Sequence, residues 1–558
     1  MKLHKMKVII SCTCLLLLIT SHNSWAQVYH IAQKYFTIPI VKQKSFVSLV
    51  RLKVNVAEND TLNSFVNQIK VSTVGSTNPS DILGIRAYCN TDSTYLFEER
   101  IFQSALFSTI ENSSADTLLL KGNLRLKPGD NYLWVGVVLK PSAQIGNTIA
   151  ISVNSITINN QSVEIPFYSI KQPSRIATAV RMFMQDNVHT SRIPGIATAK
   201  NGDLLAVFDA RYNAGRDLQG DIDIAICRST DKGNTWQPIQ RVIDMGRWGG
   251  LPEKFNGVSD ACILVDKKTG NIFIAGLWMH GVLDDNGKWI EGLSDTSKIW
   301  NHQWRNKGSQ PGFEPKQTAQ FLIVKSADNG KTWSKPVNIT TMCKKEEWWL
   351  YAPAPGCGFT LNNGVLVFPT QGRDKTGKPF SNITYSKDGG KTWETSNQAV
   401  SDSTTECAGV QLNDGTIMLN MRTNENKGIE GVGNGRTVVT TTDLGKTWNV
   451  HKTSRSALPE PVCMASLYKH QYLKNGKKHS ILLFANPNST TVRNQITLKV
   501  SFDEGNTWPS EKYILLDELK GAGYSSITSL DDETIGIIYE GSQAQLIFQQ
   551  INLKKIIE

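Results

Sequence analysis

One eight-residue pattern, Ser/Thr-x-Asp-x-Gly-x-Thr-Trp, recurs five times and constrains the fold of this chain more than any other feature. The Ser and Asp side chains of such a box can bond nearby backbone N–H groups, and its Gly can adopt a left-handed conformation. Its Trp can bury a large ring against the sheet below. The copies begin 97, 60, 55 and 60 residues apart, at residues 229–236, 326–333, 386–393, 441–448 and 501–508. A repeat of this period indicates one supersecondary unit used several times, as in a propeller.

The number and spacing of the boxes predict a six-bladed β-propeller over residues 176–558, with one blade that lacks a box. We expect the boxes to be architectural, because a turn that organises a blade need not contact a ligand. The long first interval predicts an insertion within Met245–Lys316 near the mouth, either a pocket wall or a packed surface loop. The run Glu533–Leu553 is typical of two strands, and a late strand that completes the first blade would close the ring.

Residues 27–175 contain no box and show short alternating runs separated by turn residues, such as Asn131–Leu139 and Thr148–Ile158. This pattern predicts an antiparallel β-sandwich, joined to the propeller by a linker at Lys171–Arg175. The predicted fold class is therefore all-β, a β-sandwich followed by a six-bladed propeller. The sandwich is either a carbohydrate-binding module or a domain that buttresses the propeller. As a module it would stack exposed rings on sugar, and the candidate rings are Trp134, Tyr95 and Phe97, although aromatic residues in strands more often belong to the core.

Residues 1–26 have the three parts of a secretory signal peptide: early lysines, the apolar run Val8–Thr20 and a cleavage site at Ser24-Trp25-Ala26. The apolar run is too short to span a membrane, and no later stretch approaches the necessary length. We therefore expect export to the periplasm, the cell surface or the medium.

Cysteine usage and charge exclude several classes of protein. The seven cysteines after the signal are scattered, with no C-x-x-C, and the nine histidines are isolated, so we expect no cofactor and no metal cluster; a calcium ion on a surface loop stays open. The net charge of +11 is spread along the chain, without the Lys/Arg run that marks nucleic-acid binding. The excess favours acidic substrates through long-range steering. We expect a monomer with no nucleic-acid partner and no membrane span.

The triplet Arg192–Pro194, placed before the first box, makes the interpretation specific. Together with the boxes it resembles the sialidase (neuraminidase) superfamily over Ile176–Glu558, and the layout is most similar to secreted bacterial exo-sialidases. The resemblance implies a retaining glycoside hydrolase that releases terminal α-linked sialic acids from glycoproteins, glycolipids and oligosaccharides. The partner would then be a sialylated glycan.

Sialic acid carries a carboxylate, which the rigid two-pronged guanidinium of Arg binds in a way that Lys cannot copy. Sialidases use three arginines for this group, and the resemblance places them at Arg192, Arg422 and Arg493. Three converging cations need an orienting anion. By the same resemblance, Glu540 braces Arg192.

The resemblance also implies a Tyr nucleophile. A carboxylate nucleophile would be repelled by the carboxylate on the anomeric carbon, and sialidases are the known Tyr exception among retaining glycosidases. Tyr524 matches the family's position, and Glu406, sixteen residues before Arg422, matches the acid that accepts the Tyr proton.

The family's acid/base Asp lies on a loop a few residues after an Arg, between the Arg-Ile-Pro triplet and the first box. Asp217 fits best, with Arg211 as the neighbouring Arg, and Asp221 is the second choice. Its role would be to protonate the leaving oxygen and then to activate water. We expect Asp209 to be a structural residue at a strand end.

The remaining pocket assignments are Asp260, which matches a position that faces the O4 side of the sugar, and the N-acetyl-site candidates Trp278, Met279 and His280. Three other functions stay open, and the weakest of them is a hydrolase that acts on some other acidic sugar. A non-catalytic glycan-binding propeller would not need Tyr524, Glu406 and Asp217 along with three arginines. A trans-sialidase, intermolecular or intramolecular, would use the same residues as a hydrolase.

Overall fold

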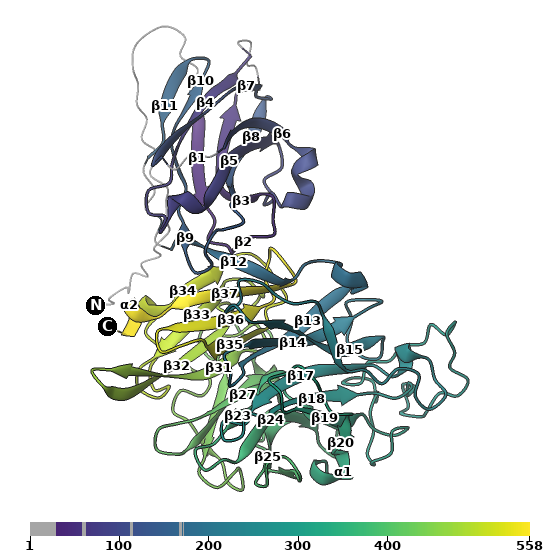
Figure 1. Ribbon diagram of the computed structural model, residues 1–558. Helices are drawn as coiled ribbons and strands as arrows, with labels where there is room; N and C mark the ends of the chain where they lie inside the picture. Colours follow the sequence, from purple (N-terminus) through teal and green to yellow (C-terminus); the bar gives the residue numbers. More distant parts are fainter. Residues whose placement is uncertain (1–28, 59–62, 112–114, 167–169, 171, 558) are drawn as a thin grey trace, which may run out of the picture.

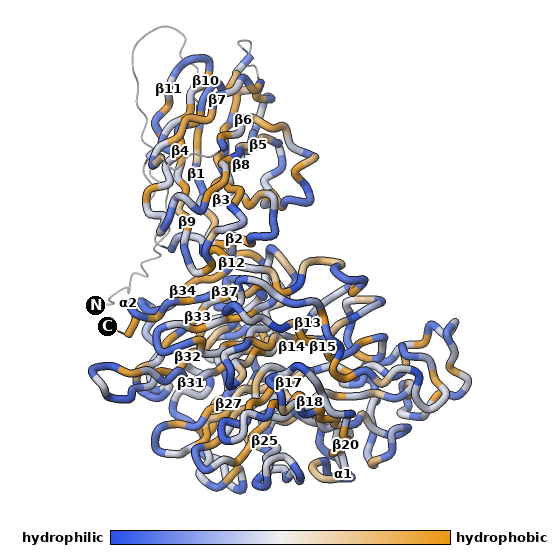
Figure 2. Tube along the Cα trace, viewed as in Figure 1, coloured by the Kyte–Doolittle hydropathy of each residue, from blue (hydrophilic) through white to orange (hydrophobic). Residues whose placement is uncertain are grey.

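The computed structural model describes residues 29–557 apart from 59–62, 112–114, 167–169 and 171, and the predicted signal peptide lies outside the described residues. A sandwich of two sheets stands on a ring of six further sheets (Figure 1). The predicted fold class is confirmed. The structure contains no described helix long and apolar enough to cross a membrane. Figure 2 shows apolar residues along the strands and polar residues in many of the connecting loops.

The sandwich consists of two antiparallel sheets whose facing side chains form its core, as in strand β3, where Val50, Leu52 and Val54 are all buried. Its five-stranded sheet runs β1 (His30–Tyr35), β3 (Val47–Val56), β8 (Gly129–Leu139), β5 (Ile82–Asn90) and β6 (Ala105–Glu111). Its four-stranded sheet runs β11 (Gln161–Glu164), β10 (Ser152–Ile158), β4 (Phe65–Ser72) and β7 (Thr117–Arg125).

Of the candidate sugar-stacking rings, Trp134 and Tyr95 prove to be core residues, 0% and 7% exposed. Both pack in the core with Phe36, and Tyr95 also meets Phe97 edge to face. Strand β8, which carries Trp134, is buried along most of its length. Alternation therefore identified the strands correctly but did not reveal that these rings face inward.

Six sheets form the blades of the propeller, and in each of them four strands pair antiparallel. Blade 1 is β13 (Thr190–Thr198), β14 (Leu204–Arg211), β15 (Ile222–Ser229) and β16 (Gln240–Ile243). Blade 2 is β17 (Val258–Val265), β18 (Ile272–Trp278), β19 (Gln320–Ser326) and β20 (Val337–Asn338). Blade 3 is β21 (Leu350–Pro353), β24 (Leu366–Arg373), β25 (Pro379–Ser386) and β26 (Glu394–Thr395), with β23 (Phe359–Thr360) also on β24 and β22 (Gly356–Cys357) on β17 of blade 2. Blade 4 is β27 (Thr404–Gln411), β28 (Ile417–Thr423), β29 (Thr437–Thr441) and β30 (Asn449–Val450). Blade 5 is β31 (Ser466–Lys474), β32 (Lys477–Pro487), β33 (Ile496–Ser501) and β34 (Ile514–Asp517). Blade 6 is β35 (Ser525–Ser529), β36 (Thr534–Tyr539), β37 (Leu546–Asn552) and β12 (Ser174–Arg181), and two short helices, α1 (Thr340–Cys343) and α2 (Lys554–Ile557), lie outside the sheets.

Each box forms the turn between the third and fourth strands of a blade, as its side chains predicted. In the first box Ser229 Oγ accepts from the Gly233 N–H at 2.8 Å, and the Asp231 carboxylate accepts from Thr235 N–H and Oγ1 at 2.9 and 2.6 Å. Gly233 has φ +90°, and a Cβ there would lie 2.1 Å from the Phe548 ring. Any residue with a Cβ is therefore excluded at position 233, both by the backbone conformation and by the packing.

Blade 6 lacks a box because no turn joins its third and fourth strands: β37 ends the chain's last sheet, and β12 comes from the start of the propeller. The ring is thus closed by its earliest strand, paired antiparallel with β37. The expected arrangement, in which a late strand completes the first blade, is the reverse of this and is wrong.

The sandwich is tied to the propeller through this same closing blade. Strand β2 (Ile40–Val41) pairs parallel with β12, and β9 (Thr148–Ile149) pairs antiparallel with it. One hydrophobic core cluster contains sandwich residues such as Trp134 together with Phe208 of blade 1 and Phe548 of blade 6. This continuity supports the buttress interpretation of the sandwich.

Candidate active site

Seven of the predicted site residues line one cavity of about 330 Å³ in the propeller: Arg192, Asp217, Asp260, Glu406, Arg422, Arg493 and Tyr524. They come from blades 1, 2, 4 and 5 and from the connection that enters blade 6. The other two, Arg211 and Glu540, are almost fully buried and hold cavity residues in place.

Backbone irregularities turn three of these side chains toward the cavity. The first strands of blades 1, 2 and 4 each contain a register shift at the position of Arg192, Asp260 and Glu406, respectively. Asp260 and Ile193, next to Arg192, also have positive φ angles of 61°. A bulge re-aims a side chain that regular pleating would direct into the sheet packing. Strained backbone conformations are therefore concentrated at the site.

Tyr524, Glu406 and Arg422 form a connected group in the lining of the cavity. The Tyr524 hydroxyl donates to Glu406 Oε1, and Arg422 Nη1 donates to Glu406 Oε2 at 2.6 Å and to the Tyr524 oxygen at 3.2 Å. Burial and the Glu406 carboxylate raise the pKa of Tyr524 well above its usual value, so the resting hydroxyl keeps its proton. Glu406 is placed to accept that proton, and Arg422 to stabilise the phenolate oxygen.

Glu540, directly after β36, bonds both the Arg192 side chain and the Tyr524 backbone. Its carboxylate accepts from Arg192 Nε at 2.5 Å, from the Ile193 N–H at 2.8 Å and from the Tyr524 N–H at 3.0 Å. Burial lowers the pKa of Arg192, but the Glu540 carboxylate outweighs it and raises that pKa above the ordinary value. Three charge-assisted bonds to one buried carboxylate therefore fix the Arg192 side chain relative to the backbone of Tyr524.

The three arginines converge on Tyr524. The guanidinium carbons of Arg192 and Arg493 lie 5.4 and 5.6 Å from the centre of its ring, and Arg422 contacts its oxygen. Arg493 is held by the carbonyl oxygens of Ala522 and Val462, at 3.0 and 3.2 Å, rather than by an acid. The cavity lining contains five arginines against three carboxylates, with Arg305 and Arg373 as the other two arginines. It is thus built to receive an anion.

Asp217 lies on the loop between β14 and β15, at the mouth. Arg211 Nη1 is 2.8 Å from its Oδ1, and His302 Nε2 is 3.2 Å from its Oδ2. Burial raises the pKa of Asp217, but the His302 hydrogen bond and the Arg211 charge outweigh it, so the pKa lies well below the usual range. The carboxylate is therefore ionised, half-exposed and directed to the cavity.

Asp209 and Asp260 lie behind Asp217. Asp209 is fully buried and accepts from Arg211 Nη2 at 2.9 Å and from the Asp260 N–H at 3.1 Å, which agrees with the structural role expected of it. Burial raises the pKa of Asp209 to about 7 and that of Asp260 well above its ordinary value. Asp260 lines the cavity and accepts from Gln371 at 3.3 Å.

The proposed N-acetyl-site residues do not reach the cavity. Trp278, Met279 and His280 are at most 4% exposed and are absent from its lining. Trp278 and His280 pack against Trp248 instead, so that prediction is wrong because the insertion covers them. Asp221, the second choice for the acid/base, lines a different cavity.

The cavity also contains residues that the sequence reasoning missed: His302, Trp304 and Arg305 from the β18–β19 connection, Gln371 and Arg373 from β24, Thr405 next to Glu406, and Asn424 after β28. The first three lie within the expected insertion, whose Trp- and His-rich composition was the only signal for them. Gln371 and Arg373 carried none beyond their place at the end of a strand.

One group of three carboxylates among the described residues is close enough to hold a metal ion: Asp223, Asp244 and Glu253. Arg241 Nη1 lies among them, 2.8, 3.6 and 3.8 Å from Asp244, Asp223 and Glu253. The chain's own guanidinium therefore occupies the place of a cation. Burial and the neighbouring acids still raise the pKa of Asp223 to about 8.

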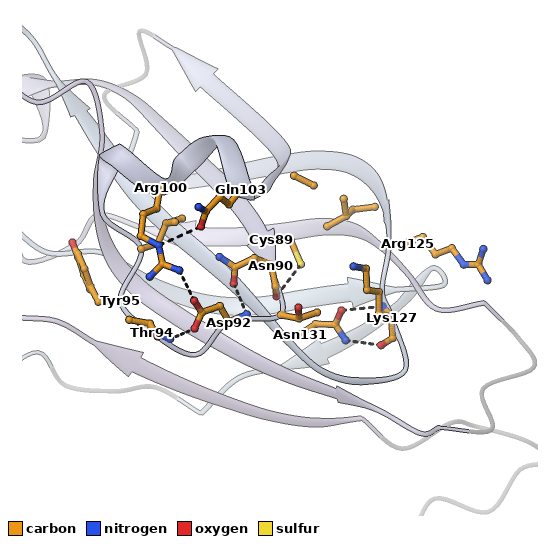
Figure 3. Close-up of a pocket in the computed structure, with 14 residues that line it drawn as sticks. Cys89, Asn90, Asp92, Thr94, Tyr95, Arg100, Gln103, Arg125, Lys127 and Asn131 are labelled. Carbon is orange, nitrogen blue, oxygen red and sulfur yellow. Dashed lines mark hydrogen bonds and ion pairs between the residues drawn. The ribbon is translucent and has the colours of Figure 1, made fainter.

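A second cavity, of about 350 Å³, lies in the sandwich (Figure 3). Its polar side chains largely satisfy one another: Arg100 donates to Asp92 at 2.6 Å, and Asn131 bonds the backbone N–H and carbonyl of Lys127. The seven cysteines of the described chain are unpaired, and all but Cys357 are buried, as expected for small core residues.

Comparisons with known proteins agree with this geometry. Residues 193–536 match a family model described as a BNR repeat-like domain, and residues 27–162 match the N-terminal domain of BNR-repeat neuraminidase. A sialidase of Bacteroides fragilis is 41% identical over 442 residues, which cover 79% of this chain and 76% of the relative. An exo-alpha-sialidase of Aspergillus fumigatus is 25% identical over 71% of this chain and 91% of its own.

The solved structure of the Hadza microbial sialidase Hz136 superposes with a TM-score of 0.82 at 34% sequence identity, over 94% of this chain and 99% of that one. Sequence and structure thus match over both the sandwich and the propeller. The chain therefore belongs to the BNR-repeat sialidase (neuraminidase) family and is a glycosidase of the exo-alpha-sialidase class.

Proposed function

We propose that the enzyme hydrolyses terminal α-linked sialic acids of glycoproteins, glycolipids and oligosaccharides, with retention of configuration and with Tyr524 as nucleophile. The observation that carries this proposal is the contact group in which Tyr524 donates to Glu406 while Arg422 contacts both. A site that only bound glycan would have no use for a proton acceptor on a buried tyrosine.

In the first half of the reaction, the sugar carboxylate binds Arg192, Arg422 and Arg493. Tyr524 Oη then attacks the anomeric carbon and gives its proton to Glu406. Asp217, which is ionised in the free cavity, must take up a proton from solvent before this step. It passes that proton to the glycosidic oxygen, and the aglycone leaves. A bound carboxylate supplies negative charge that offsets the excess of positive charge in the cavity, since five arginines line it against three acids.

In the second half, Asp217 is a carboxylate and takes a proton from water, which attacks the anomeric carbon. The bond to Tyr524 breaks, and the phenolate recovers its proton from Glu406. Two inversions at the same carbon give net retention. The ionised state of Asp217 in the free cavity suits this step.

Proton NMR of a simple sialoside during turnover tests the proposal. We expect the α-anomer of free sialic acid to appear first and the β-anomer to follow by mutarotation. First appearance of the β-anomer contradicts retention, and an anhydro product or a new sialoside identifies the transferase alternative.

We also propose that the chain is exported and that its first 26 residues are removed. Expression with those residues should deliver the enzyme outside the cytoplasm, and N-terminal sequencing should begin after Ala26. Retention in the cytoplasm with an intact N-terminus would refute this.

A further inference from the structure

The connection between β18 and β19, residues 279–319, folds back over the loop that carries Asp217. Trp300 Nε1 donates to the Asp217 carbonyl oxygen at 3.3 Å, and the Gln303 N–H donates to the Leu218 carbonyl oxygen at 3.4 Å. Arg216 stacks on the Trp300 ring, with its guanidinium carbon 5.0 Å from the ring centre. The segment around residues 300–303 therefore holds the backbone at the acid/base position and at the residue after it, and it contacts the side chain of the residue before it.

From the same segment, His302 reaches the carboxylate itself. Its Nε2 lies 3.2 Å from Asp217 Oδ2, and its side chain is 12% exposed, whereas that of Asp217 is 46% exposed. The two oxygens of Asp217 thus have different partners, Arg211 at Oδ1 and His302 at Oδ2.

The other ring nitrogen of His302 determines which way this bond points. The Trp304 backbone N–H lies 3.1 Å from His302 Nδ1. A backbone N–H can only donate, so Nδ1 must be the unprotonated acceptor, and the ring proton sits on Nε2. His302 is therefore a donor to Asp217 and stabilises the carboxylate form.

We infer that His302 is a positioning residue for Asp217: it aims the carboxylate into the cavity and donates the hydrogen bond that favours its ionised form. The inference rests on the proposed acid/base role of Asp217. The β18–β19 insertion thereby gains a role in the reaction, because its His302 provides a fixed hydrogen-bond donor to Asp217, which must alternate between acid and base.

Other charged groups act on Asp217 as well. Arg211 from β14 and Arg192 from β13 favour its ionised form, whereas Asp209 and Asp260 are acids of the same cluster. Removing His302 leaves these four groups in place. Arg211 still holds Oδ1 of the carboxylate, whereas Oδ2 loses its partner, so we expect a displaced titration and not a loss of the site.

The test compares the pH dependence of kcat and kcat/KM for His302→Phe, His302→Gln and the unmodified full-length enzyme on an aryl sialoside. His302→Phe removes the donor, so each limb that reports Asp217 should move to higher pH by about one unit. His302→Gln keeps an N–H₂ group near the Nε2 position and should restore the original limbs. His451→Phe, at a histidine that is absent from the cavity lining and bonds Thr453, is the matched control.

Coincident pH profiles of His302→Phe and the unmodified enzyme would overturn the inference, even if kcat fell. If the Phe variant does not fold, His302→Asn, whose amide is too short to reach Asp217, carries the same expectation.

A double-mutant cycle separates positioning from a general structural role. In an Asp217→Ala background, His302→Phe should cause no further loss of kcat, because its partner is gone. A further loss of tenfold or more would show that His302 acts elsewhere. Asp217→Ala alone tests the proposed function: if it keeps the original rate on a sialylated oligosaccharide, the acid/base assignment fails whatever His302 does.

Discussion

The propeller and the sandwich contain cavities of similar volume, about 330 and 350 Å³, but their charged groups are held differently. In the propeller, Glu540 and Glu406, with side chains 2% and 9% exposed, hold Arg192 and Arg422 in fixed positions. In the sandwich, Arg100 and Asp92 have side chains about 40% exposed and neutralise each other. Volume therefore does not distinguish the two cavities, whereas preorganised charge with unused donor capacity does.

The largest expected effect is that of Tyr524→Phe, which removes one oxygen from the propeller cavity. We expect kcat on a fluorogenic sialoside to fall by about a thousandfold or more, because the variant lacks the hydroxyl that donates to Glu406 and forms the covalent bond. Tyr385→Phe is the matched control, since Tyr385 is also buried and bonded to a glutamate, Glu394, but away from the cavity. Turnover near the original rate in Tyr524→Phe would refute the nucleophile assignment.

Arg493→Lys should have the next largest effect and should act mainly on KM. The guanidinium uses Nη1 and Nη2 to bond two carbonyl oxygens and still presents donors to the cavity, a geometry that an ammonium group cannot reproduce. We expect KM to rise by about tenfold to a hundredfold, with a smaller change in kcat. Arg228→Lys, on an ion pair with Asp203 on the outer part of blade 1, should leave both constants unchanged. An unaltered KM in Arg493→Lys would remove this residue from the carboxylate site.

A smaller effect is expected at Asp223, a buried acid that Arg241 only partly compensates. Its raised pKa, about 8, means that the folded state binds its proton more tightly than the unfolded chain. This group therefore makes stability decline as pH rises from about 4 towards 8. The melting temperature of Asp223→Asn should equal that of the parent near pH 4 and exceed it by several degrees at pH 7. Equal melting temperatures at both pH values would show that Arg241 compensates the charge fully.

The smallest effect is expected in the sandwich cavity. Arg100→Gln should leave kcat and KM unchanged, because the Arg100–Asp92 pair is exposed and lies in the other domain. On a glycan array, the full chain with Tyr524→Phe should bind sialylated glycans, and adding Arg493→Lys should weaken that binding. Binding to galactose-ended glycans that Arg100→Gln abolishes would instead establish the sandwich as a carbohydrate-binding module.

Much of the site was accessible from sequence because its residues carry local signals. Arg192 lies in a recognisable triplet, and the boxes serve as fixed points from which Glu406, Arg422, Arg493 and Tyr524 can be located. The structure brings all of these to one cavity. His302 had no such signal, because its contact with Asp217 joins residues 85 positions apart through an irregular loop.

The errors have a common physical origin. Trp134 and Trp278 were judged by residue type, as rings suited to sugar, yet both are buried. A strand pattern gives the period of the side chains, but the face that meets solvent depends on what packs over it. In the case of Trp278, that covering comes from the insertion.

By itself, the sequence determined the number of blades, the position of each box and the chemical identity of the site groups. Tertiary structure decided the rest: which strand closes the ring, which aromatic rings are buried, and where the bulges at Arg192, Asp260 and Glu406 direct their side chains. The boxes can be recognised in the sequence because the hydrogen bonds that form each turn lie within the eight residues of the box, as in the first one. Closure, burial and the His302–Asp217 contact depend on pairings between distant segments, which no local pattern encodes.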